Sequence, residues 1–148
     1  MPEIVIRDAD YAADYAALHA RCFKKAWNES MMRQTLLLSG ALGLMAYDGE
    51  TPAGFLIYAY GGDQADIVTF GVVPEYRGKG FSDALLNGSF AFLKIRNVDR
   101  VFLEVAVDNP HAISLYRRTG FEQIGKRPQY YRRGNEAIDA LVMARGVG

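Results

Sequence analysis

The residues best suited to bind a ligand lie in the stretch 72–82, where apolar residues give way to Arg77, Gly78, Lys79 and Gly80. Glycines in a turn from a strand to a helix let several backbone N–H groups point at one position, and the start of the helix adds positive potential there. Arg77 and Lys79 add formal positive charge beside the turn. The pattern predicts a site for an anion such as phosphate. A plain turn with two solvated cations is the alternative.

Two familiar phosphate-binding motifs do not match this turn. It lacks the Gly-Lys-Ser/Thr that follows four variable residues in a Walker loop. Its glycine spacing also differs from that of the dinucleotide-binding fingerprint. The expected anion site therefore belongs to neither class.

The elements that would position these residues can be read from hydrophobic periodicity and from helix-capping residues. Strands are expected at Glu3–Arg7, Leu42–Tyr47, Ala53–Tyr60, Ile67–Val73, Val101–Val105, Phe121–Lys126 and Ile138–Ala144. Helices are expected at Tyr11–Cys22, Asn28 to about Leu38, Gly80 to about Ile95 and Pro110–Arg118. The order β-α-α-β-β-β-α-β-α-β-β predicts a mixed α/β (α+β) fold, with helices packed on one sheet, in a single domain over residues 1–148.

Composition excludes several classes of protein. The chain has 148 residues, of which half are hydrophobic, as expected of one globular domain. Basic and acidic residues number 17 each, and the resulting zero net charge argues against a nucleic-acid binder. Residues 1–74 hold five basic and nine acidic side chains, whereas residues 75–148 hold twelve and eight. An anionic ligand is therefore expected to meet the second half, unless the division is chance scatter on a solvated surface.

The remaining sequence signals favour a cytoplasmic protein. Cys22 is the only cysteine, so no internal disulfide can form, and His19 and His111 are too distant in sequence for a metal site of the usual spacing. The first residues lack the layout of a signal peptide, and the longest apolar stretch, 36–47, is too short to span a bilayer. We expect no metal, no membrane and no nucleic acid among the partners. The oligomeric state cannot be read from these signals.

The pattern Arg-x-x-Gly-x-Gly/Ala, met here with Ser82 as the final small residue, resembles the acetyl-CoA pyrophosphate loop of the GCN5-related N-acetyltransferase (GNAT) superfamily. The expected element order is also similar, so the resemblance covers nearly the whole chain. It implies a central mixed, mostly antiparallel sheet of about seven strands with four helices packed on both faces. The loop residues that would contact acetyl-CoA are Arg77, Gly78, Lys79, Gly80, Phe81, Ser82 and Asp83.

Two further segments resemble a narrower group, the RimI-like ribosomal-protein-alanine N-acetyltransferases. The first is L-E-V-x-x-x-N-x-x-A-I-x-L-Y-x-x-x-G-F over residues 103–121. The second is the tyrosine pair at 130–131 followed by D-A-L-V-M at 139–143. Together they imply a direct attack of an amine on the thioester of acetyl-CoA.

The resemblance assigns a role to three polar residues. Glu104 matches the general base, and its place at the end of a central strand would desolvate it in part. A solvent-facing or ion-paired carboxylate is the alternative. Tyr116 matches the general acid that protonates the CoA sulfur, a role compatible with a buried ring and a polar tip. Asn109 matches a cofactor-contacting position, and capping of the helix that starts at Pro110 is an equally good explanation.

The resemblance also implies contacts made by backbone groups and aromatic side chains. Phe70, Gly71 and Val72 would present backbone groups to the pantetheine arm, with the Val72 N–H as an oxyanion donor. Ordinary sheet pairing is the alternative for these three residues. Substrate contacts are implied for Trp27, Tyr130 and Tyr131. A core anchor is the alternative for Trp27, and exposed loop aromatics are the alternative for the two tyrosines.

The leading hypothesis is an acetyl-CoA-dependent acetyltransferase acting on a peptide or protein N-terminus, for which a ribosomal protein is one candidate. An N-terminal α-amine, with a pKa of ~7.8, is deprotonated at pH 7 for only about 1 kcal/mol. A lysine amine, with a pKa of ~10.4, requires about 4.6 kcal/mol, which suits a lone carboxylate less well. A small amine such as a polyamine, amino acid or antibiotic is the alternative acceptor. A CoA-binding sensor without turnover is the non-enzymatic alternative.

Overall fold

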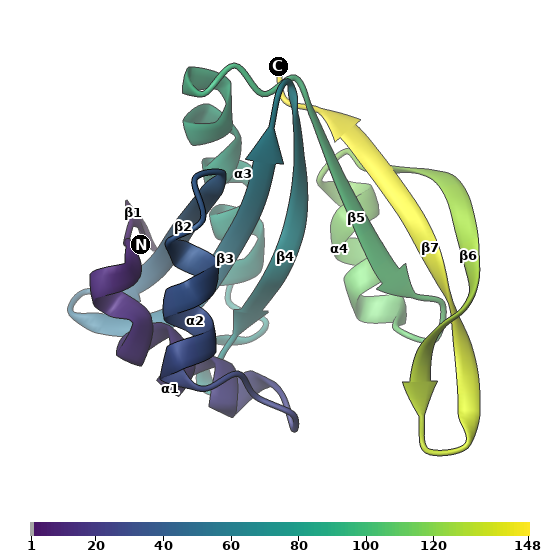
Figure 1. Ribbon diagram of the computed structural model, residues 1–148, viewed down its shortest axis with the longest axis horizontal. Helices are drawn as coiled ribbons and strands as arrows, with labels where there is room; N and C mark the ends of the chain where they lie inside the picture. The colour runs from purple at the N-terminus through teal and green to yellow at the C-terminus, as the bar shows by residue number, and fades with distance from the viewer. Residues whose placement is uncertain (1) are drawn as a thin grey trace.

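The computed structural model describes residues 2–148 and contains the strands and helices expected from the sequence, in the expected order (Figure 1). The strands are β1 (Glu3–Ile6), β2 (Ala41–Asp48), β3 (Thr51–Gly61), β4 (Gln64–Val72), β5 (Arg100–Ala106), β6 (Glu122–Arg133) and β7 (Glu136–Gly146). The helices are α1 (Ala12–Cys22), α2 (Glu29–Leu36), α3 (Phe81–Ile95) and α4 (Pro110–Arg118). Two short 3-10 turns, η1 (Ala9–Tyr11) and η2 (Pro74–Tyr76), complete the described chain.

The strands form one seven-stranded sheet in the order β1-β2-β3-β4-β5-β7-β6. Every neighbouring pair is antiparallel except β4 and β5, which run parallel. The expectation of a mixed, mostly antiparallel sheet is therefore confirmed. Strands β1–β4 are called the first arm below, and strands β5–β7 the second arm.

The two arms meet only at one end. Strand β4 pairs with β5 at Gln64–Asp66 against Arg100–Phe102, and beyond these residues the two strands diverge (Figure 1). The sequence pattern started β4 at Ile67 and therefore missed this contact. The polar side chains of Gln64 and Asp66 interrupt the apolar run that marks a buried strand.

Helices cover both faces of the sheet, as expected. Helices α1 and α2 pack on one face, where Tyr15 and Met32 bury themselves against Phe55 of β3. Helices α3 and α4 pack on the other face, where Leu85 and Leu115 join a larger core. Because strand side chains alternate between faces, β2 and β3 contribute residues to both cores.

Strand β6 differs most from the expectation, because it runs to Arg133 rather than ending at Lys126. Its pairing with β7 passes from Arg127 opposite Ala140 directly to Tyr131 opposite Ile138. The three residues 128–130 therefore lie opposite Asp139 alone, and we call them the β6 bulge. Pro128 has no N–H to donate, and the backbone of Gln129 is left-handed with φ 56°. Both features read locally as a loop, which is why the pattern ended the strand too early.

Candidate active site

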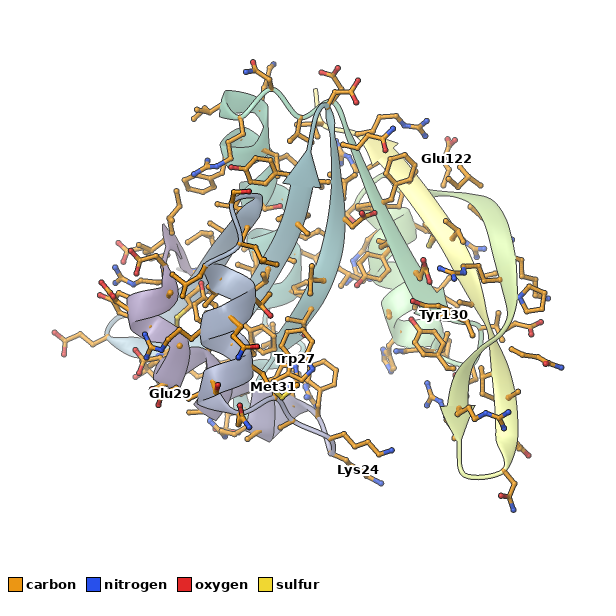
Figure 2. The ribbon with its side chains drawn as sticks, viewed as in Figure 1. Lys24, Trp27, Glu29, Met31, Glu122 and Tyr130 are labelled. Carbon is orange, nitrogen blue, oxygen red and sulfur yellow. The ribbon has the colours of Figure 1, made fainter. Side chains whose placement is uncertain are left out.

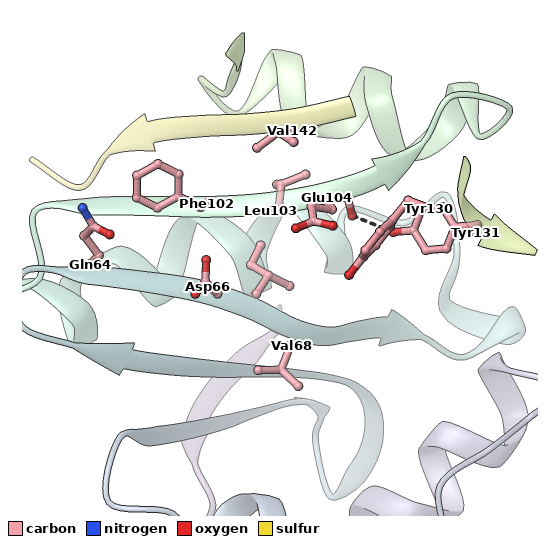
Figure 3. A pocket seen from close by; sticks show the side chains of 10 residues that line it. Gln64, Asp66, Val68, Phe102, Leu103, Glu104, Tyr130, Tyr131 and Val142 are labelled. Carbon is pink, nitrogen blue, oxygen red and sulfur yellow. Dashed lines mark hydrogen bonds between the residues drawn. The ribbon is translucent and has the colours of Figure 1, made fainter. Parts of the chain in front are cut away.

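A cleft of about 680 Å³ opens where the two arms diverge (Figure 3). Its walls come from both arms and from the β6 bulge. The residues that line it include Gln64, Asp66, Val68, Phe102, Glu104, Tyr130, Tyr131 and Val142. Three of the sequence-predicted residues, Glu104, Tyr130 and Tyr131, are thus brought together, although the two tyrosines follow Glu104 by 26 and 27 positions in the sequence.

Glu104 is placed in this cleft by strand alternation. Its neighbours Leu103 and Val105 are buried in the core beneath α3 and α4, so Glu104 faces the opposite side of β5. Oε1 of Glu104 accepts a hydrogen bond from Nη1 of Arg127 at 2.7 Å. Oε2 is buried and has no hydrogen-bond partner among residues 2–148. The ion-pair alternative is therefore observed, and one carboxylate oxygen is still left for another partner.

The β6 bulge brings three side chains onto Glu104. Asp139 of β7 holds the bulge by accepting the backbone N–H of Gln129 at 2.8 Å. The guanidinium of Arg127 lies 4.2 Å from the centre of the Tyr130 ring. The hydroxyl of Tyr131 donates to the backbone carbonyl of Glu104 at 3.1 Å. The tyrosine pair therefore belongs to a strand that wraps around the carboxylate, rather than to a free loop.

Two carboxylates, Glu104 and Asp66, line the cleft, and the pKa values of three of its titratable groups are raised. Interaction with the Glu104 carboxylate, followed by burial, raises the pKa of Tyr130. Burial first, and then the neighbouring Tyr130 and Glu104, raise the pKa of Tyr131. Burial and the charge of Glu104 also raise the pKa of Asp66, which lines the same cleft from β4. Asp66 and Arg127 were missed from the sequence, since nothing local marks either as part of a site.

Tyr116 lies on the other side of the sheet, in the core beneath α3 and α4. Its ring contacts Phe70 of β4, with 6.3 Å between ring centres, and Phe121, with 5.6 Å. Burial raises the pKa of Tyr116, so its phenol stays protonated through the neutral range. The expected combination of a core aromatic and a proton donor is compatible with this position.

The predicted anion loop has the backbone conformation that its glycines suggested. Gly78 and Gly80 are left-handed, with φ 72° and 83°, and open space lies where a Cβ would be. Gly80 is the N-cap residue of α3 and has no side chain that could accept a hydrogen bond from the N–H groups of the first turn. Lys79 lies beside the Tyr76 ring, whereas the Arg77 side chain folds back and donates to the carbonyl of Val72 at 2.8 Å.

The residues after Gly80 anchor α3. Phe81 is buried and packs on Tyr76, with 4.9 Å between ring centres. Asp83 accepts two hydrogen bonds from Arg118 of α4, at 2.9 and 2.8 Å, and this guanidinium lowers the pKa of Asp83. The negative charge of Asp83 is therefore paired with a cation on α4.

A second cavity of about 620 Å³ lies against α4. Its lining combines an apolar part with two cations and consists of Val107, Pro110, Ile113, Ser114, Arg117 and Arg118. Asn109 stands beside it, and its side chain accepts the backbone N–H of Ala112 at 3.2 Å. The capping alternative for Asn109 is thus observed, while its contact with a cofactor stays a prediction.

The segment Phe70, Gly71 and Val72 lies on the edge of β4 that faces the divergence. These residues pair with β3 on one side only, since β5 has already turned away. The carbonyl of Val72 accepts from the Arg77 side chain, whereas the next residue, Val73, donates its N–H to Ala53 of β3. Because the N–H and C=O of one strand residue point to the same side, the Val72 N–H also faces the open edge.

Trp27 does not line the cleft. It lies between α1 and α2, stacked on His19 with 5.2 Å between ring centres, and it packs against the α1–α2 core. Figure 2 shows Trp27 beside α1 and α2, away from Tyr130 on the second arm. Trp27 is thus partly buried against this core, and its contact with a substrate stays a prediction.

Two further features bear on ligands and location. Within residues 2–148, no three His, Cys, Asp or Glu side chains gather where they could hold a metal ion. Across the same described range, no helix has the length and apolar character needed to cross a membrane.

The chain matches the family model described as acetyltransferase (GNAT) family over residues 12–121. It is 35% identical to a mycothiol acetyltransferase of Clavibacter michiganensis over 133 residues, which cover 84% of this chain and 44% of that protein. It is 39% identical to the N-alpha-acetyltransferase RimI of Mycobacterium tuberculosis over 83 residues, which cover 56% of this chain and 49% of that protein. The chain thus spans less than half the length of these curated relatives.

Among solved structures, the fold is similar to the crystal structure of the ribosomal-protein-alanine N-acetyltransferase from Escherichia coli. The TM-score is 0.91 at 26% sequence identity, and the match covers 100% of this chain and 95% of that one.

Proposed function

The chain belongs to the acetyltransferase (GNAT) family, and from this membership we propose that it transfers an acetyl group from acetyl-CoA to a primary amine. The observation that carries the proposal is the position of Glu104. Its carboxylate faces a cleft between the diverging strands β4 and β5, with one buried oxygen that has no partner among residues 2–148.

The residues at the start of α3 and along α4 suit the binding of acetyl-CoA. The left-handed glycines Gly78 and Gly80 allow close approach to the start of α3, where a pyrophosphate is favoured by N–H groups and by the helix dipole. The cavity against α4 offers apolar side chains together with Arg117 and Arg118, which suits a nucleotide that carries phosphate. Acetyl-CoA supplies the activated thioester, and the open edge of β4 at Val72 is where we propose that the thioester is held.

Proton transfer is divided between the two faces of the sheet. Glu104, on the cleft side, takes a proton from the acceptor nitrogen as that nitrogen bonds to the acetyl carbon. The Val72 N–H donates to the oxygen that becomes negative. Tyr116, on the opposite side, gives its proton to the sulfur as the C–S bond breaks, and the products are an amide and a thiol. Base and acid therefore act from opposite sides of the reacting carbon.

We propose that the acceptor is an N-terminal α-amine of a peptide or protein. A single carboxylate suffices for an amine whose pKa is ~7.8. The Tyr130 and Tyr131 side chains supply aromatic walls beside Glu104, which suit a peptide chain. Two relatives support the same acceptor, the N-alpha-acetyltransferase of Mycobacterium tuberculosis and the ribosomal-protein-alanine N-acetyltransferase of Escherichia coli, with a ribosomal protein as one candidate.

A small cationic amine is the second candidate acceptor, and Asp66 is the observation that favours it. Its carboxylate joins Glu104 in the cleft, and no salt bridge within residues 2–148 pairs it with a cation. Two carboxylates in one cleft attract an acceptor with two positive charges.

An acceptor panel separates the two candidates. The purified protein is incubated with acetyl-CoA and with peptides bearing a free or an acetylated N-terminus, diamines or single amino acids, and release of the CoA thiol is measured. Turnover of free-N-terminus peptides alone supports the proposal, and turnover of small amines alone contradicts the peptide assignment. No thiol release with any amine contradicts acetyl transfer itself and favours the sensor alternative. A cytoplasmic location, where Cys22 stays reduced, is part of the proposal.

A further inference from the structure

The two oxygens of the Glu104 carboxylate have different surroundings. Oε1 lies 2.7 Å from Nη1 of Arg127. Oε2 is buried and has no partner among residues 2–148. A buried carboxylate oxygen without a hydrogen bond is unfavourable, so its persistence calls for a reason.

An unrestrained carboxylate does not distinguish its two oxygens, since the terminal torsion of glutamate is broad and roughly two-fold. An ion pair to one oxygen removes that equivalence. The pair with Arg127 is also a hydrogen bond to a charged donor, which is the stronger kind. It therefore decides which oxygen is left toward the cleft.

Arg127 is itself held in place from two directions. Its backbone lies opposite Ala140 in the last pair before the β6 bulge. Its guanidinium lies 4.2 Å from the Tyr130 ring centre, an attractive cation–π arrangement. The bulge therefore aims Arg127 at a carboxylate on a strand that does not pair with β6, because β7 lies between them.

We propose that Arg127 is a positioning residue for the base: it holds Oε1 of Glu104 so that Oε2 receives the proton from the acceptor nitrogen. The inference rests on the proposed function and names a component that neither the sequence motif nor the family match assigns. Arg127 touches neither acceptor nor donor in this scheme and acts through Glu104 alone.

The charged and titratable groups around Glu104 fix the expected direction of its pH dependence. Asp66 faces it from β4, and Arg127, Tyr130 and Tyr131 face it from β6. Arg127 is the cation paired with this carboxylate, and Asp66 is a like charge in the same cleft. Removal of Arg127 leaves the repulsion from Asp66 unopposed, so the acidic limb of the kcat/KM profile is expected to move to higher pH.

Three variants test the proposal. Arg127→Met removes the guanidinium group. Arg127→Lys keeps a positive charge but lacks the planar, two-pronged guanidinium. Arg133→Met is the matched control. Arg133 lies on the same strand, is 55% exposed where Arg127 is 54% exposed, and pairs with Asp108 at 3.3 Å. We measure kcat and the pH profile of kcat/KM at saturating acetyl-CoA.

Arg127→Met is expected to lower kcat by about 10- to 100-fold, part of the contribution of a positioned base. Its acidic limb is expected to move to higher pH by about half a unit to one unit, since solvent screens an exposed pair. Arg127→Lys is expected to return the acidic limb of the kcat/KM profile to its parental pH but to recover only part of kcat, because an ammonium group lacks the planar geometry of a guanidinium. Arg133→Met is expected to match the parent. Parental kcat and an unmoved limb in Arg127→Met would overturn the proposal, as would equal loss in both Arg127 variants with an unmoved limb.

A measurement without turnover separates this proposal from the proposed function. The side-chain carboxyl carbon of Glu104 is followed by ¹³C NMR during titration, with Glu104→Gln to assign the signal. The titration midpoint is expected to rise in Arg127→Met and to stay in Arg133→Met. A raised midpoint in a protein that acetylates no amine refutes the proposed function and leaves the contact standing. An unmoved midpoint refutes the positioning role whatever the activity.

Discussion

The backbone N–H of Trp27 donates a hydrogen bond to Nδ1 of the buried His19 ring, at 3.1 Å. Nδ1 therefore carries no proton, and the neutral ring holds its proton on Nε2, 3.2 Å from Oγ1 of Thr69. Thr69 directly precedes the β4 segment proposed to hold the thioester. One imidazole thus ties α1, the segment after it and β4 into a single unit on the first arm.

This imidazole predicts how stability depends on pH. Burial lowers the pKa of His19, so the unfolded chain binds the proton more readily than the folded chain. The stability contributed by the neutral ring is complete above the ordinary histidine pKa of ~6.5 and is lost as the pH falls through the lowered folded value. The free energy of unfolding in urea, measured from pH 8 to pH 5, is therefore expected to fall more steeply for the parent than for His19→Gln. His111→Gln, on the exposed His111, is the control and should follow the parent; a parallel course for all three proteins would exclude the effect.

Replacement of the base predicts a loss of rate without a loss of donor binding. Glu104→Gln keeps the size of the side chain but cannot accept the acceptor's proton. We expect kcat to fall by about 100-fold or more. The Kd for acetyl-CoA, measured by calorimetry, is expected to change less than about two-fold, since Glu104 faces the side of the sheet opposite to α3 and α4. Glu122→Gln, at the exposed start of β6, controls for loss of charge; an unchanged kcat in Glu104→Gln would remove Glu104 from the mechanism.

The phenol of Tyr116 predicts a separation of rate from stability. Tyr116→Phe keeps the buried ring, so the free energy of unfolding is expected to change by about 0.5 kcal/mol or less. The rate is expected to fall by about 10-fold or more, because the sulfur loses its proton donor.

Tyr58→Phe is the matched comparison for Tyr116. Tyr58 is also buried with a raised pKa, and its hydroxyl lies 2.6 Å from Oγ of Ser89, away from the cleft. This variant is expected to lose about 1 kcal/mol of stability and to keep its kcat. The opposite pattern, with stability lost at Tyr116 and rate lost at Tyr58, would contradict the assignment of the acid.

The anion loop predicts a binding defect that backbone strain alone does not produce. Gly80→Ala and Gly62→Ala each place a Cβ on a left-handed residue, with φ 83° and 59°, in open space. Both are expected to lower stability by about 1 kcal/mol. Only Gly80→Ala is expected to weaken acetyl-CoA binding, by about 10-fold, because only Gly80 leads into α3. Equal acetyl-CoA affinity in the two variants would argue against pyrophosphate binding at this loop.

Local chemistry determined much of this protein. Apolar periodicity predicted the element order, together with Pro110 at the start of a helix and Gly120 after its end. The apolar neighbours of Glu104 also showed the alternation of side chains along its strand. The glycine turn before α3 was also predictable, because left-handed backbone at Gly78 and Gly80 is a local property of glycine.

Only the tertiary structure decided what surrounds Glu104. Its contact with Arg127 joins positions 23 residues apart across an intervening strand, and it depends on a bulge held by Asp139. The β4–β5 pairing likewise ends at Asp66, beyond which the cleft opens, and it joins two strands that are separated in the sequence by α3. Capping, periodicity and glycine conformation act within a few residues, so a sequence displays them. Strand register and ion pairs between distant strands exist only once the sheet has formed.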